Sequence, residues 1–313
     1  KIFYLTLEYF WKTRERNWFT LSNLYQVTGC SKQSFHQWKE RHMQQIAIHE
    51  QIIYLVHQVR DDHPGMGMRD LYYRLLPDGI GRNAFEELCK VHNLYVRKPS
   101  VSMRTTDSRG VSRFENKLKG LRIDHINQVW QSDITYFEVQ GRFYFLTFIQ
   151  DTYTKRIIGH STSKSLKTEE TTYTALKMAI RNRRGQKLEG LILHSDGGGQ
   201  YYDKEFLALT QKYCMYNSMA EYAWENGMAE RLNGVIKNNY LQYRKCKSFT
   251  ELAKEVDRSV LLYNYEKPHK MLQKKSPMQF EKLILPLVRQ TPQKMTKSLD
   301  ANLKGMGHRV PSL

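Results

Sequence analysis

The chain has 313 residues, with 49 Lys and Arg against 31 Asp and Glu, which gives a formal net charge of +18 and a sequence pI near 9.6. A hydrophobic fraction of 40% and a charged fraction of 26% are typical of globular proteins, and this length allows two or three domains. No apolar run approaches the roughly 18 residues that span a bilayer, and Glu8, Lys12 and Arg14 interrupt the N-terminal stretch. We therefore expect a cytoplasmic protein with no membrane partner. The positive charge favours a nucleic-acid partner.

The chain begins at Lys1 rather than at a methionine, which leaves open whether residues precede it. The spacing of its four cysteines predicts neither a disulfide framework nor a structural zinc site, because they form no C-x-x-C pair and no histidine pairs match them. These cysteines, expected to be reduced thiols, are Cys30, Cys89, Cys214 and Cys246.

Residues 1–45 are predicted to form a helix-turn-helix DNA-binding domain. Residues 21–28 keep helical spacing, Gly29 marks a turn, and Ser31 is expected to cap a second helix that buries Phe35 and Trp38. A plain helical hairpin is the alternative. The exposed side chains of the second helix that we expect to contact DNA are Lys32, Gln33, His36 and Gln37.

Residues 46–98 predict a second helical, helix-turn-helix-like domain, since apolar residues keep helical spacing on both sides of a break at residues 63–68. Residues 99–118 lack hydrophobic periodicity and are rich in Lys and Arg, which indicates a basic linker. Such a linker either lies along a phosphate backbone or is a solvated tether. Its candidate DNA contacts are Arg104, Arg109, Arg113 and Lys117.

Residues 119–285 change to a mixed strand and helix pattern. Strands are predicted at 129–137, 143–149, 156–161, 191–195 and 216–220, and helices at 168–184, 204–213 and 228–245. The resulting order, βββαβαβα, is that of the ribonuclease H fold, an α/β fold with a mixed five-stranded sheet and helices. In that fold the first and fourth strands are neighbours. The full architecture is thus this core preceded by all-α helix-turn-helix modules.

Three acidic residues lie within or at the end of these predicted strands and helices. Asp133 lies in the first strand, Asp196 ends the fourth, and Glu230 lies in the long last helix, where it shares a face with Asn233 and Lys237. Adjacent first and fourth strands would bring the two aspartates together, with the helix over them. Carboxylate oxygens are the ligands that magnesium prefers, so we expect a site for divalent cations.

The motifs around these acids identify a resemblance. They occupy residues 129–136 (VWQSDITY), 150–159, 194–201 (HSDGGGQY), 225–237 (ENGMAERLNGVIK), 263–269 and 276–280. In this order and spacing they resemble the DDE insertion-sequence transposases with a retroviral-integrase-type catalytic core, in the bacterial group encoded as OrfA and OrfB. The resemblance covers most of residues 119–285 and, more weakly, residues 48–98.

The resemblance implies a transposase that binds the ends of a mobile DNA element and catalyses strand cleavage and 3′-OH strand transfer. Asp133, Asp196 and Glu230 are the implied catalytic and metal-binding residues, holding two Mg²⁺ ions for which Mn²⁺ can substitute. The implied partners are double-stranded DNA, as terminal inverted repeats and target DNA, and further copies of the chain in a homodimer or higher oligomer. The implied location is the bacterial cytoplasm, at the nucleoid.

Two departures from the family pattern concern the third acid. The separation 230 − 196 = 34 positions is slightly shorter than usual, and Glu225 stands where many relatives have an aspartate, so it rivals Glu230. His194 is expected to be a packed or second-sphere imidazole rather than a magnesium ligand.

Further candidate DNA contacts surround the acids, although packed or solvated roles explain such residues as well. The basic tail at residues 286–313 is expected to contact DNA or a neighbouring protomer. The candidates near the acids are Arg231, Asn233, Lys237, Tyr201 and Tyr202.

Two other functions stay open. One is a structure-specific nuclease with the same fold, which would cut DNA without joining it. The other is a catalytically inactive DNA-binding regulator derived from a transposase, for which a broken acid triad would be expected.

Overall fold

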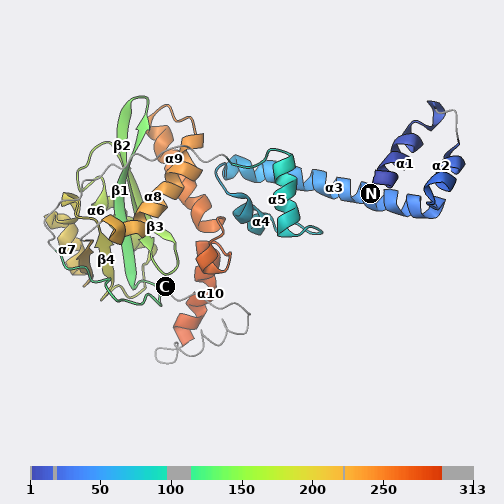
Figure 1. Ribbon diagram of the computed structural model, residues 1–313. Helices are drawn as coiled ribbons and strands as arrows, with labels where there is room; N and C mark the ends of the chain where they lie inside the picture. Colours follow the sequence, from blue (N-terminus) through green and yellow to red (C-terminus); the bar gives the residue numbers. More distant parts are fainter. Residues whose placement is uncertain (1, 17–19, 97–113, 221–222, 291–313) are drawn as a thin grey trace. The chain divides into compact units, whose positions relative to one another are not determined.

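The computed structural model describes residues 2–16, 20–96, 114–220 and 223–290, which form two compact units (Figure 1). One unit consists of residues 1–61 and 75–95, and the other of residues 62–74 and 96–313. Residues 97–113, which include most of the predicted linker at 99–118, lie outside the described residues, as does the tail from residue 291. None of the helices that the structure describes has the length and apolarity needed to cross a membrane.

The first unit is helical in its described part. Its helices are α1 (Ile2–Lys12), α2 (Leu21–Thr28), α3 (Lys32–Asp62) and α5 (Arg82–Val91), with a 3-10 turn at Arg14–Arg16. Helix α4 (Met68–Leu75) crosses from the second unit into the first at its last residue.

The two helices and the turn predicted for residues 21–38 are present, as α2, Gly29 and the beginning of α3. Gly29 has a φ of 67°, a left-handed conformation that glycine adopts without steric cost. The hydroxyl of Ser31 then accepts the N–H of Ser34 at 3.1 Å, so Ser31 caps α3 as predicted. Phe35 is fully buried, with its ring 6.1 Å from that of Tyr25.

Helix α3 is continuous over 31 residues and passes through the predicted domain boundary between residues 45 and 46. The two predicted helical domains therefore share one helix. No glycine or proline interrupts residues 32–62, so no local signal ends the helix there.

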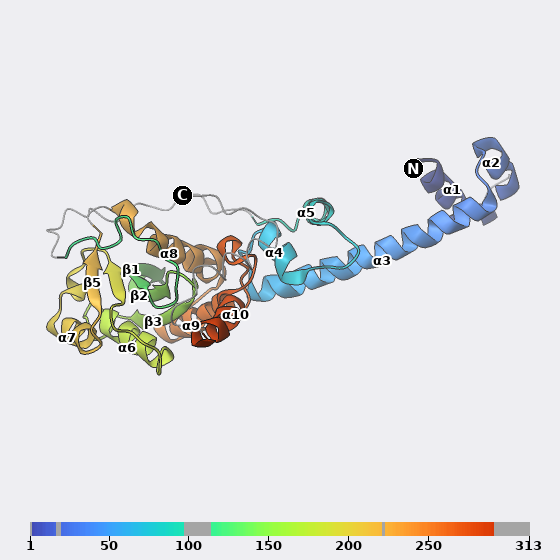
Figure 2. The same ribbon diagram turned by 90° about the horizontal axis from the view of Figure 1, so that it is seen from below.

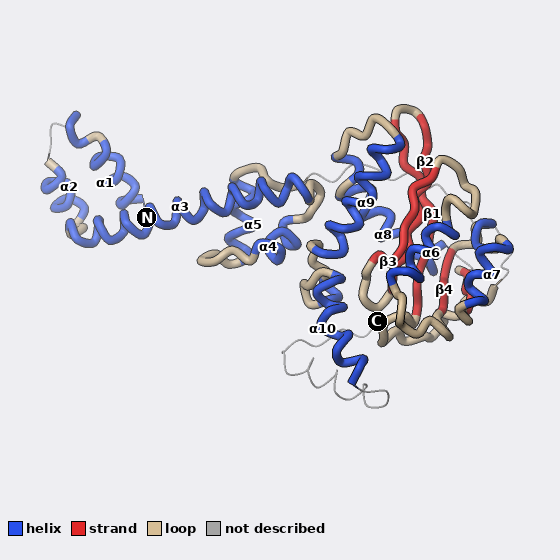
Figure 3. The backbone as a smooth tube through the Cα atoms, turned by 180° about the vertical axis from the view of Figure 1, so that it is seen from behind, coloured by secondary structure: helices blue, strands red, loops and turns tan. Residues whose placement is uncertain are grey.

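The second unit is built on a mixed five-stranded sheet (Figure 3). The strand order is β3-β2-β1-β4-β5, in which β1 pairs antiparallel with β2 and parallel with β4. This topology confirms the predicted ribonuclease H-like order and the predicted neighbourhood of the first and fourth strands. The strands are β1 (Val129–Val139), β2 (Arg142–Asp151), β3 (Ile157–Ser163), β4 (Ile192–Ser195) and β5 (Tyr216–Met219).

Helices cover both faces of this sheet. Trp130, Leu176 and Phe206 belong to one buried cluster, in which α6 (Thr172–Asn182) and α7 (Lys204–Lys212) pack on the sheet. Phe148 and Ile236 belong to a second cluster, formed with α8 (Gly227–Asn239) and α9 (Phe249–Tyr265). Figure 2 shows α6 and α7 on the side of the sheet opposite α8. The short 3-10 helices of this unit are Gly199–Tyr201, Ala223–Asn226, Leu241–Tyr243 and Lys270–Leu272.

Helix α10 (Pro277–Gln290) continues past residue 285, the predicted end of the core. Its buried Glu281 accepts hydrogen bonds from Arg156 at 2.7 Å and from Arg183 at 2.5 Å. Arg183, from the end of α6, also lies 3.3 Å from a carboxylate oxygen of Asp151 at the end of β2. These buried ion pairs attach α10 to the sheet, because leaving any one of the charges unpaired would be costly.

A short segment before α4 packs against α8 and α9 of the same unit. The N–H of Gly65 donates to the carbonyl of Asn239 at 2.9 Å. His63 is fully buried between the hydroxyl of Tyr240, at 3.2 Å, and the carboxylate of Glu266, at 3.1 Å. Helix α8 therefore ends at Asn239 rather than near the predicted residue 245, since its last carbonyl is already bonded and Tyr240 turns inward.

Gly65→Ala is expected to lower the free energy of unfolding by about 1–3 kcal/mol, because an added Cβ would lie 2.4 Å from the Asn239 Cα. Urea unfolding followed by circular dichroism measures this change. Gly67→Ala is the matched control, since nothing lies within 4 Å of its added Cβ and the stability should stay within about 0.5 kcal/mol. Equal stability of the two variants would show that Gly65 is not in close contact with α8.

Candidate active site

Asp133 and Asp196 are brought together by the pairing of β1 with β4. The two strands run parallel with Ser132 opposite Ser195, so the two aspartates are the next residues on neighbouring strands. Neighbouring strands lie about 4.8 Å apart. The N–H of Gly198 donates to Asp196 at 3.3 Å, which orients its carboxylate in the loop after β4.

Glu230 lies in the first turn of α8, which is attached to β1 at several points. The side-chain amide of Asn226, just before the helix, donates to the carbonyl of Ser132 at 3.3 Å. That of Asn233, one turn further along, donates to the carboxylate of Asp133 at 2.7 Å. The helix that carries the third acid is therefore fixed directly beside the first.

The three carboxylates act on one another electrostatically. Burial, then the charges of Asp196 and Glu230, raise the pKa of Asp133 to about 8, against the opposing hydrogen bonds of the Ile134 backbone and Asn233. Burial and the charge of Glu230 also raise the pKa of Asp196, which the Gly198 N–H opposes. Like charges thus crowd one another at this place, and a bound cation would relieve that repulsion.

The donor set fits magnesium, because all three side chains offer carboxylate oxygens. The Glu230 side chain is exposed, whereas the two aspartates are partly buried. Within the described part of the chain, no three His, Cys, Asp or Glu side chains are grouped closely enough to hold one ion. Joint metal binding therefore requires Glu230 to turn toward the aspartates.

Glu225, the rival for the third acid, acts on a different group. It lies in the 3-10 helix before α8, and its charge acts on the pKa of His194. Glu230, by contrast, raises the pKa of both aspartates. This difference favours Glu230 as the partner of Asp133 and Asp196.

His194 is a packed residue of the sheet. It is fully buried in β4, and its Nδ1 lies 3.0 Å from the hydroxyl of Ser218 in β5. Burial lowers its pKa to about 4, against the charge and backbone of Glu225, so the ring is neutral near pH 7. This placement agrees with a packing role.

Asn233 and Lys237, both predicted to contact DNA, are used inside the fold. Asn233 is 5% exposed and bonded to Asp133. The Lys237 ammonium donates to the Thr135 hydroxyl at 3.0 Å and lies 5.3 Å from the centre of the Tyr136 ring. For Asn233 the predicted DNA contact is therefore corrected to a contact that orients an acid, because the side chain has no exposed face to offer.

Tyr201 and Tyr202, predicted to contact DNA, also pack within the protein. Tyr201 is 3% exposed in the first core cluster, and its hydroxyl lies 2.9 Å from that of Ser132. The Tyr202 ring stacks on Phe114 with centroids 5.4 Å apart, and its hydroxyl lies 2.6 Å from the sulfur of Met219. The predicted DNA contact of Tyr201 is thus corrected to core packing, since its ring is enclosed.

The other predicted DNA contacts either lie outside the described residues or have exposed side chains. Arg104, Arg109 and Arg113 lie outside the described residues. Asn226 was not predicted to have a role; an asparagine before a helix is a sequence signal for an N-cap, but this side chain donates to the Ser132 carbonyl and does not cap α8. The predicted contacts with exposed side chains are Lys32, Gln33, His36, Gln37, Lys117 and Arg231.

Comparisons with known proteins point to one family. Residues 124–229 match the family described as integrase core domain, and residues 217–277 match a second family of the same description. The chain is 26% identical over 269 residues to the insertion element IS600 uncharacterized 31 kDa protein of Shigella sonnei, covering 82% of this chain and 96% of that protein. It is 25% identical over 159 residues to the transposase for insertion sequence element IS904 of Lactococcus lactis subsp. lactis, covering 50% of this chain and 62% of that protein.

Among solved structures, the HTLV-2 integrase catalytic core domain in complex with magnesium is similar at 22% identity and a TM-score of 0.41, covering 49% of this chain and 95% of that one. The two family matches run together from residue 124 to residue 277 and contain Asp133, Asp196 and Glu230. Residues 124–277 therefore match integrase core domains, and the chain is similar to proteins of bacterial insertion sequences, one of them a transposase.

Proposed function

We propose that this protein binds the ends of a mobile DNA element, cuts a strand at each end and joins the freed 3′-OH to a phosphodiester of target DNA. One observation carries the proposal. Parallel pairing of β1 with β4 places Asp133 beside Asp196, and α8 brings Glu230 near enough to raise the pKa of both. Such crowding of acids is typical of functional sites rather than of stabilising surface charges.

Asp133, Asp196 and Glu230 are proposed to hold two Mg²⁺ ions, for which Mn²⁺ can substitute. Bound magnesium would activate the attacking hydroxyl and stabilise the charge that develops on the phosphate and on the leaving 3′-oxygen. The chain's own groups keep the carboxylates in place, since Asn233 orients Asp133 and the Gly198 N–H orients Asp196.

DNA recognition is proposed for the exposed beginning of α3. Lys32, Gln33, His36 and Gln37 lie there with exposed side chains, just after the turn at Gly29. In helix-turn-helix proteins the second helix presents such residues to the major groove. Arg231, exposed directly after Glu230, is proposed to contact a phosphate near the acids.

The proposed partners are double-stranded terminal repeats, target DNA and at least one further copy of the chain. Two element ends have to be joined to one target, which favours a homodimer or higher oligomer. The proposed place of action is the bacterial nucleoid in the cytoplasm, where that DNA lies.

Asp133→Asn, Asp196→Asn and Glu230→Gln are each expected to lower Mg²⁺-dependent strand cleavage and joining by more than about 100-fold, because each removes a charge that holds the metal. The assay follows a labelled duplex of the element end, intact to measure cleavage and with a free 3′-OH to measure joining, together with a supercoiled target. Duplex binding in calcium should remain within about threefold, since the helix-turn-helix is untouched.

Glu169→Gln is the matched control, because Glu169 is an exposed acid before α6 and its loss should leave both activities unchanged. Full joining by any of the three acid variants would reject the assignment. Cutting without any joined product in the native protein would instead identify a structure-specific nuclease, and no cutting in magnesium or manganese would identify a regulator.

Asn233→Ala is expected to raise the Mg²⁺ concentration for half-maximal activity by about 10- to 100-fold, because groups that orient a metal ligand have effects of this size. Asn238→Ala is its control on the same helix, with an exposed side chain. A titration of activity with magnesium separates this role from a purely structural one. An Asn233→Ala variant with unchanged magnesium dependence would contradict the role.

A further inference from the structure

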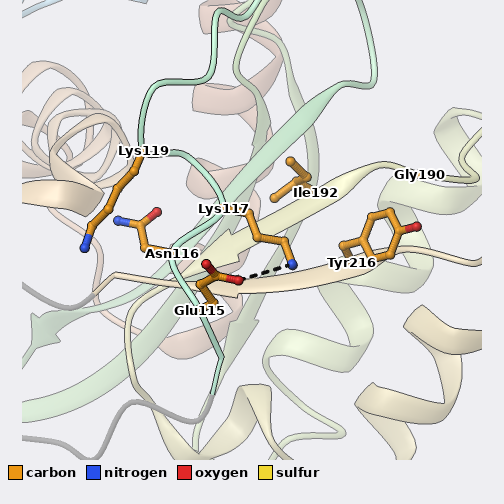
Figure 4. Close-up of a pocket in the computed structure, with 7 residues that line it drawn as sticks. All are labelled: Glu115, Asn116, Lys117, Lys119, Gly190, Ile192 and Tyr216. Atoms are coloured by element: carbon orange, nitrogen blue, oxygen red, sulfur yellow. Dashed lines mark ion pairs between the residues drawn. The ribbon is translucent and has the colours of Figure 1, made fainter.

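A surface hollow of about 630 Å³ lies at the start of β4 and β5 (Figure 4). Ile192 and Tyr216, the first residues of these parallel strands, stand opposite one another in register and line it. Asp196 is four residues after Ile192, just beyond the other end of β4, so the hollow and the acids lie at opposite ends of that strand, about 13 Å apart at 3.3 Å per residue.

The hollow combines positive charge with an aromatic ring. Lys117 and Lys119 line it with exposed side chains, and Tyr216 is 56% exposed. The Lys117 ammonium lies 5.7 Å from the centre of the Tyr216 ring and 3.8 Å from a carboxylate oxygen of Glu115. The Glu115 side chain is 85% exposed, so this ion pair holds the lysine only weakly and a phosphate can replace it.

The backbone that carries the lysines is fixed in place. The N–H of Lys117 donates to the Ser218 hydroxyl of β5 at 2.9 Å. The N–H of Leu118 donates to the side chain of Asn116, which is 8% exposed, also at 2.9 Å. A surface held in this way binds without first having to order a loop.

We infer that this hollow is a second DNA-contacting surface, in which Lys117 and Lys119 bind backbone phosphates and Tyr216 packs against the adjoining sugar. The inference rests on the proposed function for the identity of the ligand, and adds a contact region separate from the acids. Lysines and tyrosines are frequent phosphate and sugar contacts, and the charge of +18 favours an extended polyanion over a small neutral ligand.

The test is DNA binding by fluorescence anisotropy between 50 and 200 mM NaCl, with the full chain, a chelator and a labelled 30-base-pair duplex. Each phosphate contact contributes about 0.9 to the slope of log affinity against log salt, so the double variant Lys117→Gln, Lys119→Gln should flatten that slope by about 1.8. At 0.1 M salt this corresponds to a loss of affinity of up to roughly 60-fold, the same for an element end and an unrelated duplex.

Lys270→Gln with Lys282→Gln is the matched control, since both lysines are exposed and neither lines the hollow. It should leave the slope unchanged. Tyr216→Ala should weaken binding without changing the slope, because a neutral side chain releases no counterion.

An unchanged slope in the Lys117, Lys119 variant, or an equal change in the control pair, would overturn the inference. Magnesium-dependent joining measured on the same preparations keeps the two proposals apart. If the native protein joins DNA but the Lys117, Lys119 variant has an unaltered slope, only the role of the hollow is rejected. If the hollow binds DNA but the native protein never cuts or joins it, the proposed function is rejected.

Discussion

The placement of the carboxylates of Asp133 and Asp196 side by side and partly out of water is the constraint around which the second unit is organised. Asp133 and Asp196 are neighbours only because β1 and β4 pair in parallel with Ser132 opposite Ser195. In water such charges would separate, so their positions must be imposed by contacts elsewhere. The hydrogen bonds of Asn226 and Asn233 impose them by attaching the start of α8 to β1. The same attachment leaves the Glu230 side chain exposed, where it is able to turn toward a cation.

Contacts distant from the acids also stabilise the positions of the sheet and of α8. Arg183 joins Asp151 at the end of β2 to Glu281 of α10, so the strand beside β1 is tied to two helices by fully buried charges. At the other end of α8, Gly65 donates to the last carbonyl of the helix. The helix is therefore held at both ends, by Asn226 and Asn233 near its start and by Gly65 at its last carbonyl.

The sequence predicted the parts of this site that depend on local periodicity and on topology. Strand and helix order followed from hydrophobic spacing, and the pairing of Asp133 with Asp196 followed from that order. The sequence-based prediction of exposed contacts failed where a polar or aromatic side chain turns inward. Asn233 and Tyr201 read as exposed contacts, and only the packing of α8 on β1 and of the core cluster buries them. The contact of Gly65 with Asn239 joins distant parts of the chain and has no local signature.

The most direct test of the account is thermal unfolding with and without magnesium. A raised folded-state pKa means that the charge on Asp133 opposes folding as the pH rises from about 4 toward about 8, so Asp133→Asn in chelator at pH 8 should melt above the native protein. Magnesium should then raise the melting temperature of the native protein and leave the variant unchanged. A variant that melts below the native protein and gains equally from magnesium would contradict the claim that these acids repel one another and share a cation.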